Sequence, residues 1–172
     1  MNFYIGSDHR GFKLKELVKQ ALAAEGYAVT DVGNEAYDEN DDYPLVAKAV
    51  AEKVSFDYEQ SRGVLLCGSG VGVAIVANKY VNVRAGLVTT PDQAFDAKND
   101  DDVNILCLPA DYLEWNIVEK ILKTWLETPF SGEERFKRRL KEISGIEAGI
   151  VKKIEDDAVE DALKQREARF DM

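Results

Sequence analysis

The chain has 172 residues, a formal net charge of −10 at pH 7 and 45% hydrophobic residues. This length and composition predict one domain of ordinary size, and the acidic balance argues against general binding to nucleic acid, which needs a basic face. The apolar runs are too short to cross a bilayer and the N-terminus does not resemble a signal peptide, so we expect a cytoplasmic protein without a membrane partner. Two cysteines, Cys67 and Cys107, fit a reducing compartment.

Strand-like and helical segments alternate along the first 130 residues. The strand-like segments are Phe3–Gly6, Tyr27–Val32, Gly63–Cys67, Val83–Thr89 and Asn104–Leu108. The helical segments are Lys13–Ala24, Pro44–Val54, Val73–Tyr80, Pro91–Lys98 and Asp111–Leu126. Alternation of this kind is typical of a parallel sheet with helices on both faces, so the predicted fold class is α/β.

Two charged segments lie outside this pattern. Asn34–Asp42 is an acidic loop, which we interpret as a solvated connection. From Ser131 onward the chain is helix-like and highly charged, with a sparse apolar stripe formed by Ile143, Ile146, Ile150, Val151, Ile154, Ala158 and Leu163. We expect a domain of residues 1–145 and a helical extension of residues 146–172, which either packs on a partner subunit or forms a solvated tail.

The most informative stretch is the loop CGSGVG, Cys67 to Gly72, after the third strand-like segment. In an open parallel sheet, ligands bind beyond the carboxyl ends of the strands, where this loop and the Gly6–His9 turn are expected to lie. The glycines allow backbone N–H groups to converge on an anion at the start of the next helix. The alternative is a tight turn beside a structural cysteine.

Several known motifs do not fit this loop. It lacks the Gly-Lys-Ser/Thr of a Walker phosphate loop, and its G-x-G-x-G spacing is not the dinucleotide fingerprint, which disfavours a mononucleotide-binding module. Cys67 and Val71 stand where a nucleophile elbow around Ser69 would need glycines. With one histidine in the sequence, no zinc-type spacing exists, and we expect neither a metal nor a cofactor.

A thiol beside converging backbone donors suits proton transfer at carbon. The dipole of the following helix favours the thiolate of Cys67. A thiolate that removes a proton next to a carbonyl leaves an enediolate, whose oxyanion the N–H groups of Gly68–Gly72 would stabilise. Returning the proton to the neighbouring carbon is an aldose–ketose isomerisation, which requires no cofactor.

From Phe3 to about Ile143 the chain resembles the ribose-5-phosphate isomerase type B family, which includes the galactose-6-phosphate isomerase subunits. Five segments carry the resemblance, in family order: GSDHRGFKLKE (Gly6–Glu16), DYP (Asp42–Pro44), CGSGVGVAIVANK (Cys67–Lys79), VRAGLV (Val83–Val88) and VNILCL (Val103–Leu108). The resemblance implies a Rossmann-like three-layer domain with a five-stranded parallel sheet. It also implies a homodimer that can pair into tetramers, with an active site between subunits that isomerises a phosphorylated sugar without metal.

The resemblance also assigns roles to individual residues. Cys67 matches the base that moves the proton between C1 and C2, and the anion hole is formed by Gly68, Ser69, Gly70, Val71 and Gly72, with the Ser69 hydroxyl in place of a threonine. Substrate contacts are matched by Asp8, His9, Tyr43, Arg135 and Arg139, the two arginines reaching in from the neighbouring subunit. On residue pattern alone, Asp8 is equally a helix cap, and the two arginines belong to a solvated helix face.

Three positions depart from the family pattern. Asp100 replaces the histidine that opens the sugar ring, and Asp101 replaces the asparagine beside it. Asp111 replaces a phosphate-binding arginine, for which Arg10 or Arg138 could compensate. Asp100 either opens the ring as an acid or base, or ring opening is left to solvent. We therefore predict retained enediolate chemistry with an altered substrate or phosphate contact; the alternative is a non-catalytic sugar-phosphate binder or a partner subunit of a heteromeric isomerase.

Overall fold

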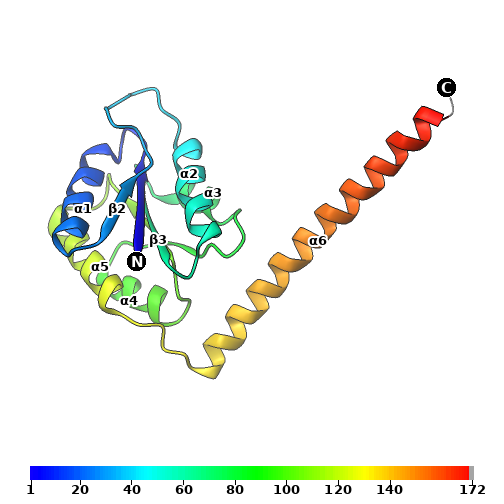
Figure 1. The fold of residues 1–172 in the computed structure, drawn as a ribbon. Coiled ribbons are helices and arrows are strands. Elements are labelled where there is room, and N and C mark those ends of the chain that lie inside the picture. Colours follow the sequence, from blue (N-terminus) through cyan, green and yellow to red (C-terminus); the bar gives the residue numbers. More distant parts are fainter. Residues whose placement is uncertain (171–172) are drawn as a thin grey trace. The chain divides into compact units, whose positions relative to one another are not determined.

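The computed structural model describes the backbone of residues 1–170 and the side chains of residues 1–158. Its strands are β1 (Asn2–Ser7), β2 (Ala28–Asp31), β3 (Ser61–Cys67), β4 (Ala85–Leu87) and β5 (Ile105–Pro109). Its helices are α1 (Phe12–Ala24), α2 (Tyr43–Phe56), α3 (Val71–Ala77), α4 (Pro91–Asn99), α5 (Trp115–Glu127) and α6 (Glu134–Phe170). The predicted α/β class with a five-stranded parallel sheet is confirmed (Figure 1).

The sheet has the strand order β2-β1-β3-β5-β4, and all neighbouring strands run parallel. The register pairs Ser7 of β1 with Leu66, and Cys67 of β3 with Pro109 of β5. The carboxyl ends of the three central strands therefore meet at one edge of the sheet. From β1 the chain first adds β2 on one side and then continues with β3 on the other side, so the order of the strands switches between β1 and β3. In open sheets of this kind, ligands bind at such a switch point.

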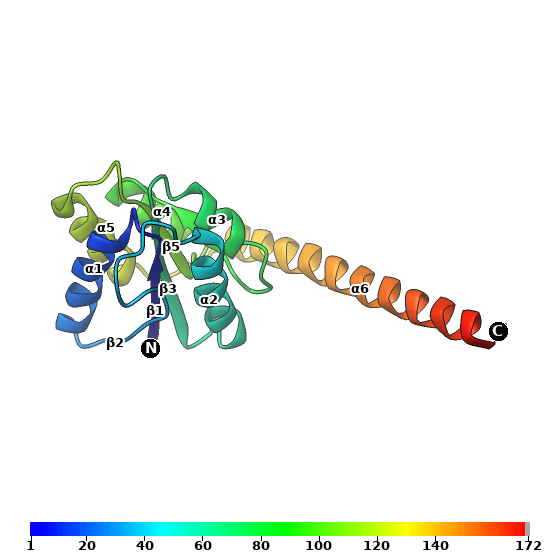
Figure 2. The same ribbon diagram turned by 90° about the horizontal axis from the view of Figure 1, so that it is seen from above.

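Helices cover both faces of the sheet (Figure 2). The strands send alternate side chains to the two faces. On one face, Val64 and Leu66 of β3 pack in a core with residues of α1, α4 and α5. On the other face, Leu65 and Cys67 pack in a second core with residues of α2 and α3. Because successive residues of a strand point to opposite faces, the apolar run Val64–Cys67 of β3 supplies both cores.

Two helix boundaries differ from expectation at the edge where the loop lies. α3 begins at Val71, two residues before the predicted Val73, because Gly70 takes a left-handed conformation with φ of 72° and starts the helix at once. α5 begins at Trp115 rather than at Asp111, because the Asp111 N–H donates a hydrogen bond to the Gly68 carbonyl at 3.1 Å. Asp111 therefore belongs to the loop region and not to the helix.

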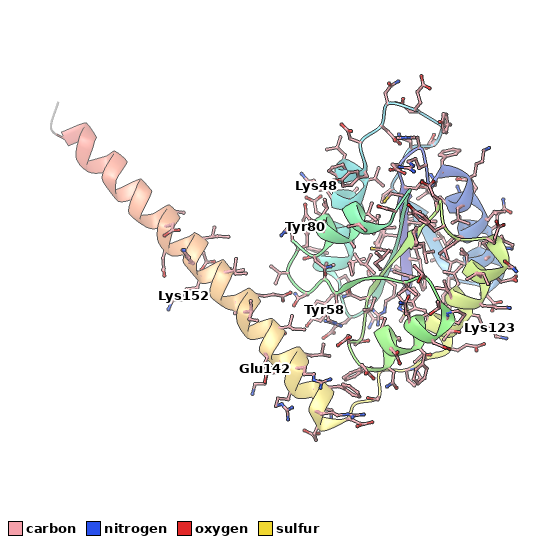
Figure 3. All side chains as sticks on the ribbon, turned by 180° about the vertical axis from the view of Figure 1, so that it is seen from behind. Lys48, Tyr58, Tyr80, Lys123, Glu142 and Lys152 are labelled. Carbon is pink, nitrogen blue, oxygen red and sulfur yellow. The ribbon has the colours of Figure 1, made fainter. Side chains whose placement is uncertain are left out.

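The chain forms two compact units, Met1–Ser131 and a second that begins at Gly132. The division predicted at residues 145 and 146 falls within α6. The predicted apolar stripe along α6 is exposed at Ile146, Ile150 and Ile154, and charged side chains such as Glu142 project from the same helix (Figure 3). Leu163 lies outside the described side chains. Among the described helices, none combines the length and the apolar character that a membrane crossing needs.

Candidate active site

The thiol of Cys67 stands at the carboxyl end of β3, at the start of the glycine loop. The backbone N–H of Gly70 donates a hydrogen bond to Cys67 Sγ, with an N···S distance of 3.1 Å. Gly70, the residue that donates this hydrogen bond, is the N-cap of α3 and takes the left-handed conformation. The predicted juxtaposition of a thiol and a loop donor is thus present, and a donor of this kind stabilises negative charge on the sulfur.

The second cysteine, Cys107, differs from Cys67 in its position and in its surroundings. It lies in the middle of β5, fully buried, and burial raises the pKa of its thiol far above the ordinary value, with nearby Cys67 adding to the effect. A thiol held neutral inside the core is inert as a base. Position at the strand end therefore separates Cys67, a candidate catalytic group, from Cys107, a structural one.

Two large side chains lie directly on the glycine loop. The ring of Tyr43 packs on Gly72, where an added Cβ would stand 2.6 Å from Cε2 of the tyrosine. The guanidinium of Arg10 lies on Gly68 in the same way. Cys67 itself is only 4% exposed, whereas Tyr43 is 40% exposed and the Arg10 side chain 56%. Cys67 is thus a buried residue, and Tyr43 and Arg10 are the more exposed side chains in contact with its loop.

The Ser69 hydroxyl and Val71 complete the exposed surface of the loop. Ser69 Oγ accepts a weak hydrogen bond from the Val71 N–H at 3.4 Å, so the hydroxyl lies beside the first turn of α3. Both side chains are exposed. The structure therefore brings together the predicted thiol, the loop residues and Tyr43.

Asp8 is used by the backbone of the turn that follows β1. Its Oδ1 atom accepts hydrogen bonds from the N–H groups of Arg10 at 3.0 Å and Gly11 at 3.1 Å, and the residue is buried. Asp8 therefore closes the turn that precedes α1, but it does not cap the helix, whose N-cap is Gly11 without a side-chain cap hydrogen bond. The predicted substrate contact of Asp8 stays a prediction.

His9 is held by a carboxylate that sequence reasoning missed. Asp41 Oδ1 lies 2.8 Å from His9 Nδ1 and also accepts the His9 backbone N–H at 2.8 Å, while Asp41 Oδ2 accepts from Asn34 Nδ2 at 3.0 Å. The hydrogen bond to Asp41 raises the pKa of His9 above its ordinary value of 6.5, with a smaller contribution from Asp8, against some opposing desolvation. The acidic loop read as a solvated connection therefore orients the histidine, with Nδ1 toward Asp41.

The reversed charge at Asp111 is matched by Arg10. Arg10 Nη2 and Asp111 Oδ2 form an ion pair across the first residue of the loop. The Ala110 N–H donates to the Cys67 carbonyl at 2.9 Å, and the Asp111 N–H to that of Gly68, so the end of β5 is tied to the loop. Arg10, suggested from the sequence as a compensating cation, thus lies in contact with the substituted position.

Asp100 and Asp101 lie at the other edge of the sheet. They lie between the end of α4 and the start of β5. The first residue of β5 is at the amino edge of the sheet, and its last residue, Pro109, pairs with Cys67 at the carboxyl edge. Asp100 Oδ1 accepts a hydrogen bond from Asn99 Nδ2 at 2.7 Å. Since the full length of β5 separates the two edges, Asp100 and Asp101 do not share a site with Cys67 of the same chain.

A cluster of charges fixes the segment that carries these aspartates. Arg84 donates to the carbonyls of Asp101 and Asp102 at 2.9–3.0 Å and to Asp102 Oδ2 at 2.8 Å, and Lys98 Nζ pairs with Asp102 Oδ1. Burial lowers the pKa of Lys98. Burial also lowers the pKa of Arg62, where the charge of Asp102 acts against this shift and the charge of Arg84 adds to it. One carboxylate thus holds two cations that have lost part of their hydration.

Arg135 and Arg139 belong to α6, in the second unit of the chain. Their guanidinium carbons lie 4.4 Å and 5.5 Å from the ring centre of Phe136, so both stack on the same aromatic side chain. Arg135 also pairs with Glu133 at 2.9 Å. Their predicted contact with phosphate in a neighbouring subunit stays a prediction.

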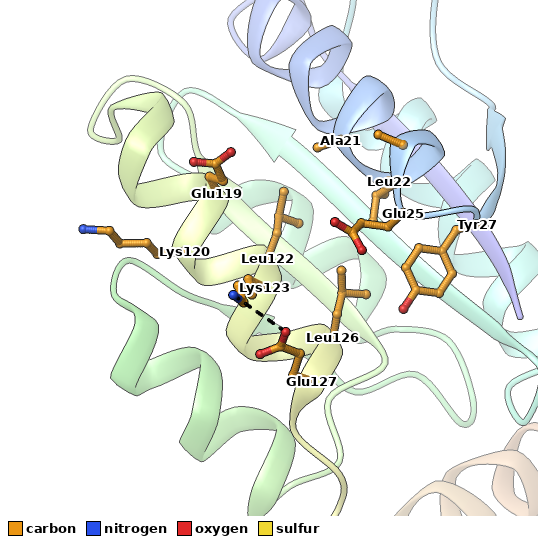
Figure 4. Close-up of a pocket in the computed structure, with 11 residues that line it drawn as sticks. Ala21, Leu22, Glu25, Tyr27, Glu119, Lys120, Leu122, Lys123, Leu126 and Glu127 are labelled. Atoms are coloured by element: carbon orange, nitrogen blue, oxygen red, sulfur yellow. Dashed lines mark ion pairs between the residues drawn. The ribbon is translucent and has the colours of Figure 1, made fainter.

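A groove of about 700 Å³ lies between the C-terminal parts of α1 and α5, away from the loop (Figure 4). Leu22, Tyr27 and Leu126 form its floor, and charged side chains such as Lys123 and Glu127, which pair with each other, stand at its rim. None of the sequence-predicted site residues lines it. In the described part of the chain, no group of His, Cys, Asp and Glu side chains is arranged to hold a metal ion.

Comparisons with known proteins agree with this geometry. A family model described as Ribose/Galactose Isomerase matches residues 3–143. A probable ribose-5-phosphate isomerase B of Mycoplasma genitalium is 38% identical over 142 residues, covering 83% of this chain and 93% of the relative. Ribose-5-phosphate isomerase B of Escherichia coli is 34% identical with the same coverage, and D-erythrulose-4-phosphate isomerase of Pectobacterium atrosepticum is 32% identical, covering 77% and 86%.

Solved structures are also similar. The crystal structure of Ribose-5-phosphate Isomerase B from Mycoplasma genitalium with bound Ribulose-5-phosphate superposes with a TM-score of 0.83 at 37% identity. The match covers 86% of this chain and 96% of that chain. Most of α6 continues beyond residue 143, where the family match ends.

Proposed function

Because the chain belongs to the Ribose/Galactose Isomerase family, we propose that it interconverts a phosphorylated pentose or hexose aldose and its ketose through an enediolate. The observation that carries this proposal is the hydrogen bond from the Gly70 N–H to Cys67 Sγ at 3.1 Å, at the carboxyl edge of the sheet. It places the thiol against a backbone donor of the glycine loop. Both unpaired cysteines fit action in the reducing cytoplasm.

In this mechanism the Cys67 thiolate removes the proton from C2 of the open-chain aldose. The C–H electrons form the C1–C2 double bond, and the carbonyl electrons move to O1, which becomes the oxyanion. The backbone N–H groups of Gly68–Gly72 stabilise O1, and the Ser69 hydroxyl passes the O2 proton to O1. Cys67 then returns its proton to C1, which leaves a carbonyl at C2. No cofactor takes part, because the proton and the electrons stay within the sugar and the thiol.

Four of the predicted residues act from a neighbouring subunit. Asp100 and Asp101 lie at the edge opposite Cys67, so they reach a sugar only at the site of another copy of the chain. There Asp100 opens the sugar ring, and Arg135 and Arg139 bind the phosphate. The functional unit is therefore a homodimer at least. His9, oriented by Asp41, Asp8 and Tyr43 contact the sugar from the subunit that supplies Cys67.

The test compares the two cysteines of the chain. We expect Cys67→Ala to lower turnover of ribose 5-phosphate by about 10³-fold or more, because a positioned base contributes on the order of 10²–10⁴-fold. Cys107→Ala, which also removes a buried thiol, should keep most of the activity. Product formation is followed by NMR in deuterated water, where a working enzyme also exchanges the C2 proton. Near-normal turnover by Cys67→Ala with an unchanged circular dichroism spectrum would refute the assignment of the base.

A second candidate function follows from the altered ring-opening position. With Asp100 in place of histidine, the chain could bind sugar phosphates without turning them over, or complete the site of a different subunit. Such a binder would retain ribose 5-phosphate in a calorimetric titration but would exchange no C2 proton for deuterium. A screen of phosphorylated aldoses and ketoses by the same NMR measurement therefore separates the two functions.

A further inference from the structure

A positive charge lies at the opening of the glycine loop. Asp8 Oδ1 binds the Arg10 N–H at 3.0 Å and so fixes the turn from which the Arg10 side chain extends. The guanidinium fills the space that a side chain at residue 68 would occupy: a Cβ there would stand 2.8 Å from Nη1. Arg10 therefore contacts the backbone of the loop that begins at Cys67.

The partner of this guanidinium is a carboxylate that is itself attached to the loop. The Asp111 N–H is bonded to the Gly68 carbonyl at 3.1 Å, and Asp111 Oδ2 pairs with Arg10 Nη2. The Asp111 side chain is 33% exposed. Ion pairs that are open to water are weak, so an anionic solute can replace the carboxylate.

We propose that Arg10 binds the anionic group of the substrate, a phosphate or a sulfonate, and that Asp111 holds Arg10 on Gly68 until that group displaces it. This inference rests on the proposed function, because it assigns an anion contact within the same site. A guanidinium presents a fork of N–H donors that matches two oxygens of such a group. Asp111 occupies one arm of the fork in the free protein and competes with every incoming anion.

The charge of the whole chain explains why a local cation is needed. With a net charge of −10, the protein repels anions at long range, so an anionic substrate depends on a cation at the site itself. Arg10 stands on the loop beside Cys67 in the same compact unit, so its distance from the reacting thiol is set by one chain. Asp111 makes binding selective among anions, since only an anion that displaces the Asp111 carboxylate can bind Arg10.

The experiment measures binding in the full-length chain carrying Cys67→Ala, where turnover cannot interfere. Calorimetry with ribose 5-phosphate should give a dissociation constant that rises about tenfold or more with Arg10→Met, since a charge-assisted bidentate contact is lost. Arg10→Lys should restore part of the affinity. Asp111→Asn should tighten binding by about threefold, because the competing carboxylate is gone. Inorganic phosphate and methanesulfonate, titrated separately, decide which anion Arg10 prefers.

Neutral ribose and Lys13→Met are the controls. Lys13 is an exposed cation at the second residue of α1, so its loss changes the net charge equally without touching the loop. Ribose binding should not depend on Arg10. An unchanged dissociation constant for ribose 5-phosphate in Arg10→Met, or equal losses for ribose and its phosphate, overturns the inference. If Arg10 governs phosphate binding while the wild-type chain isomerises no sugar, the proposed function fails and this inference stands.

Discussion

The charged side chains at the two edges of the sheet differ in how far they are exposed to solvent. At the carboxyl edge, Arg10 and Asp111 form an exposed pair, and the buried Asp8 carboxylate is bonded to backbone N–H groups. At the amino edge, Asp102 is shared between two poorly hydrated cations, Arg84 and Lys98. Contacts of the first kind can be exchanged for those of a ligand, whereas the second kind fix the chain. The difference separates a surface suited to binding from one suited to presenting Asp100 and Asp101 rigidly.

Among the tests that compare the two edges, the largest effect is expected from a single methyl group on the loop. Gly70→Ala forces φ of 72° on a residue with a side chain and places Cβ 3.2 Å from the Pro109 nitrogen. Loss of a preorganised oxyanion donor costs about 10²–10³-fold in kcat. Gly149→Ala is the matched control, because its Cβ meets open space within α6 and should stabilise that helix by up to about 1 kcal/mol. Wild-type kcat in Gly70→Ala would show that the loop geometry is dispensable.

The next prediction asks whether the two edges cooperate between subunits. Cys67→Ala and Asp100→Ala should each be poorly active alone. If Asp100 serves the Cys67 of a neighbour, random mixing after denaturation and refolding should restore about a quarter of wild-type activity, because half of the dimers are hybrids with one intact site. The assay is ribose 5-phosphate turnover by NMR. Mixtures no more active than the separate variants would place the two residues in unconnected functions.

Removing the shared carboxylate at the amino edge should destabilise the fold. Asp102→Ala leaves Arg84 and Lys98 without their common partner, and breaking a buried pair costs about 3–5 kcal/mol, reduced here to about 2 kcal/mol because these side chains are partly solvated. Urea denaturation measures the loss. Asp101→Asn serves as the control, since Arg84 binds the carbonyl of Asp101 and not its side chain. Equal stability of the two variants would contradict the role given to Asp102.

The smallest effect concerns pH at the carboxyl edge. The hydrogen bond to Asp41 raises the pKa of His9 above 6.5, so the pair stabilises the fold fully below pH 6.5 and loses this contribution as the pH rises through the folded pKa. We expect Asp41→Asn to bring the pKa of His9 down toward 6.5 and to remove that pH dependence. The titration of the single histidine is read by NMR. An unmoved titration curve would mean that Asp41 does not control His9.

Sequence patterns predicted what depends on local periodicity and on the motif. Apolar runs identified the central strands β1, β3 and β5, and the G-x-G-x-G spacing located the loop that bonds to Cys67. The pair of His9 and Asp41, 32 residues apart, was out of reach. Arg10, 101 residues from Asp111, was named beside Arg138 as a compensating cation, but the sequence did not predict that the two side chains pair. No periodicity encodes which of many acidic residues meets a given cation. Asp41 in particular was hidden in a loop whose composition suggested only solvation.

The contrast between the two cysteines makes the protein a natural target for electrophilic probes. Cys107 is fully buried within β5, whereas Cys67 is 4% exposed at the end of β3, next to the loop on which Tyr43 and Arg10 pack. We therefore expect a thiol-reactive reagent to modify Cys67 faster than Cys107. Inhibitors carrying a warhead and an anionic tail would exploit both features at once.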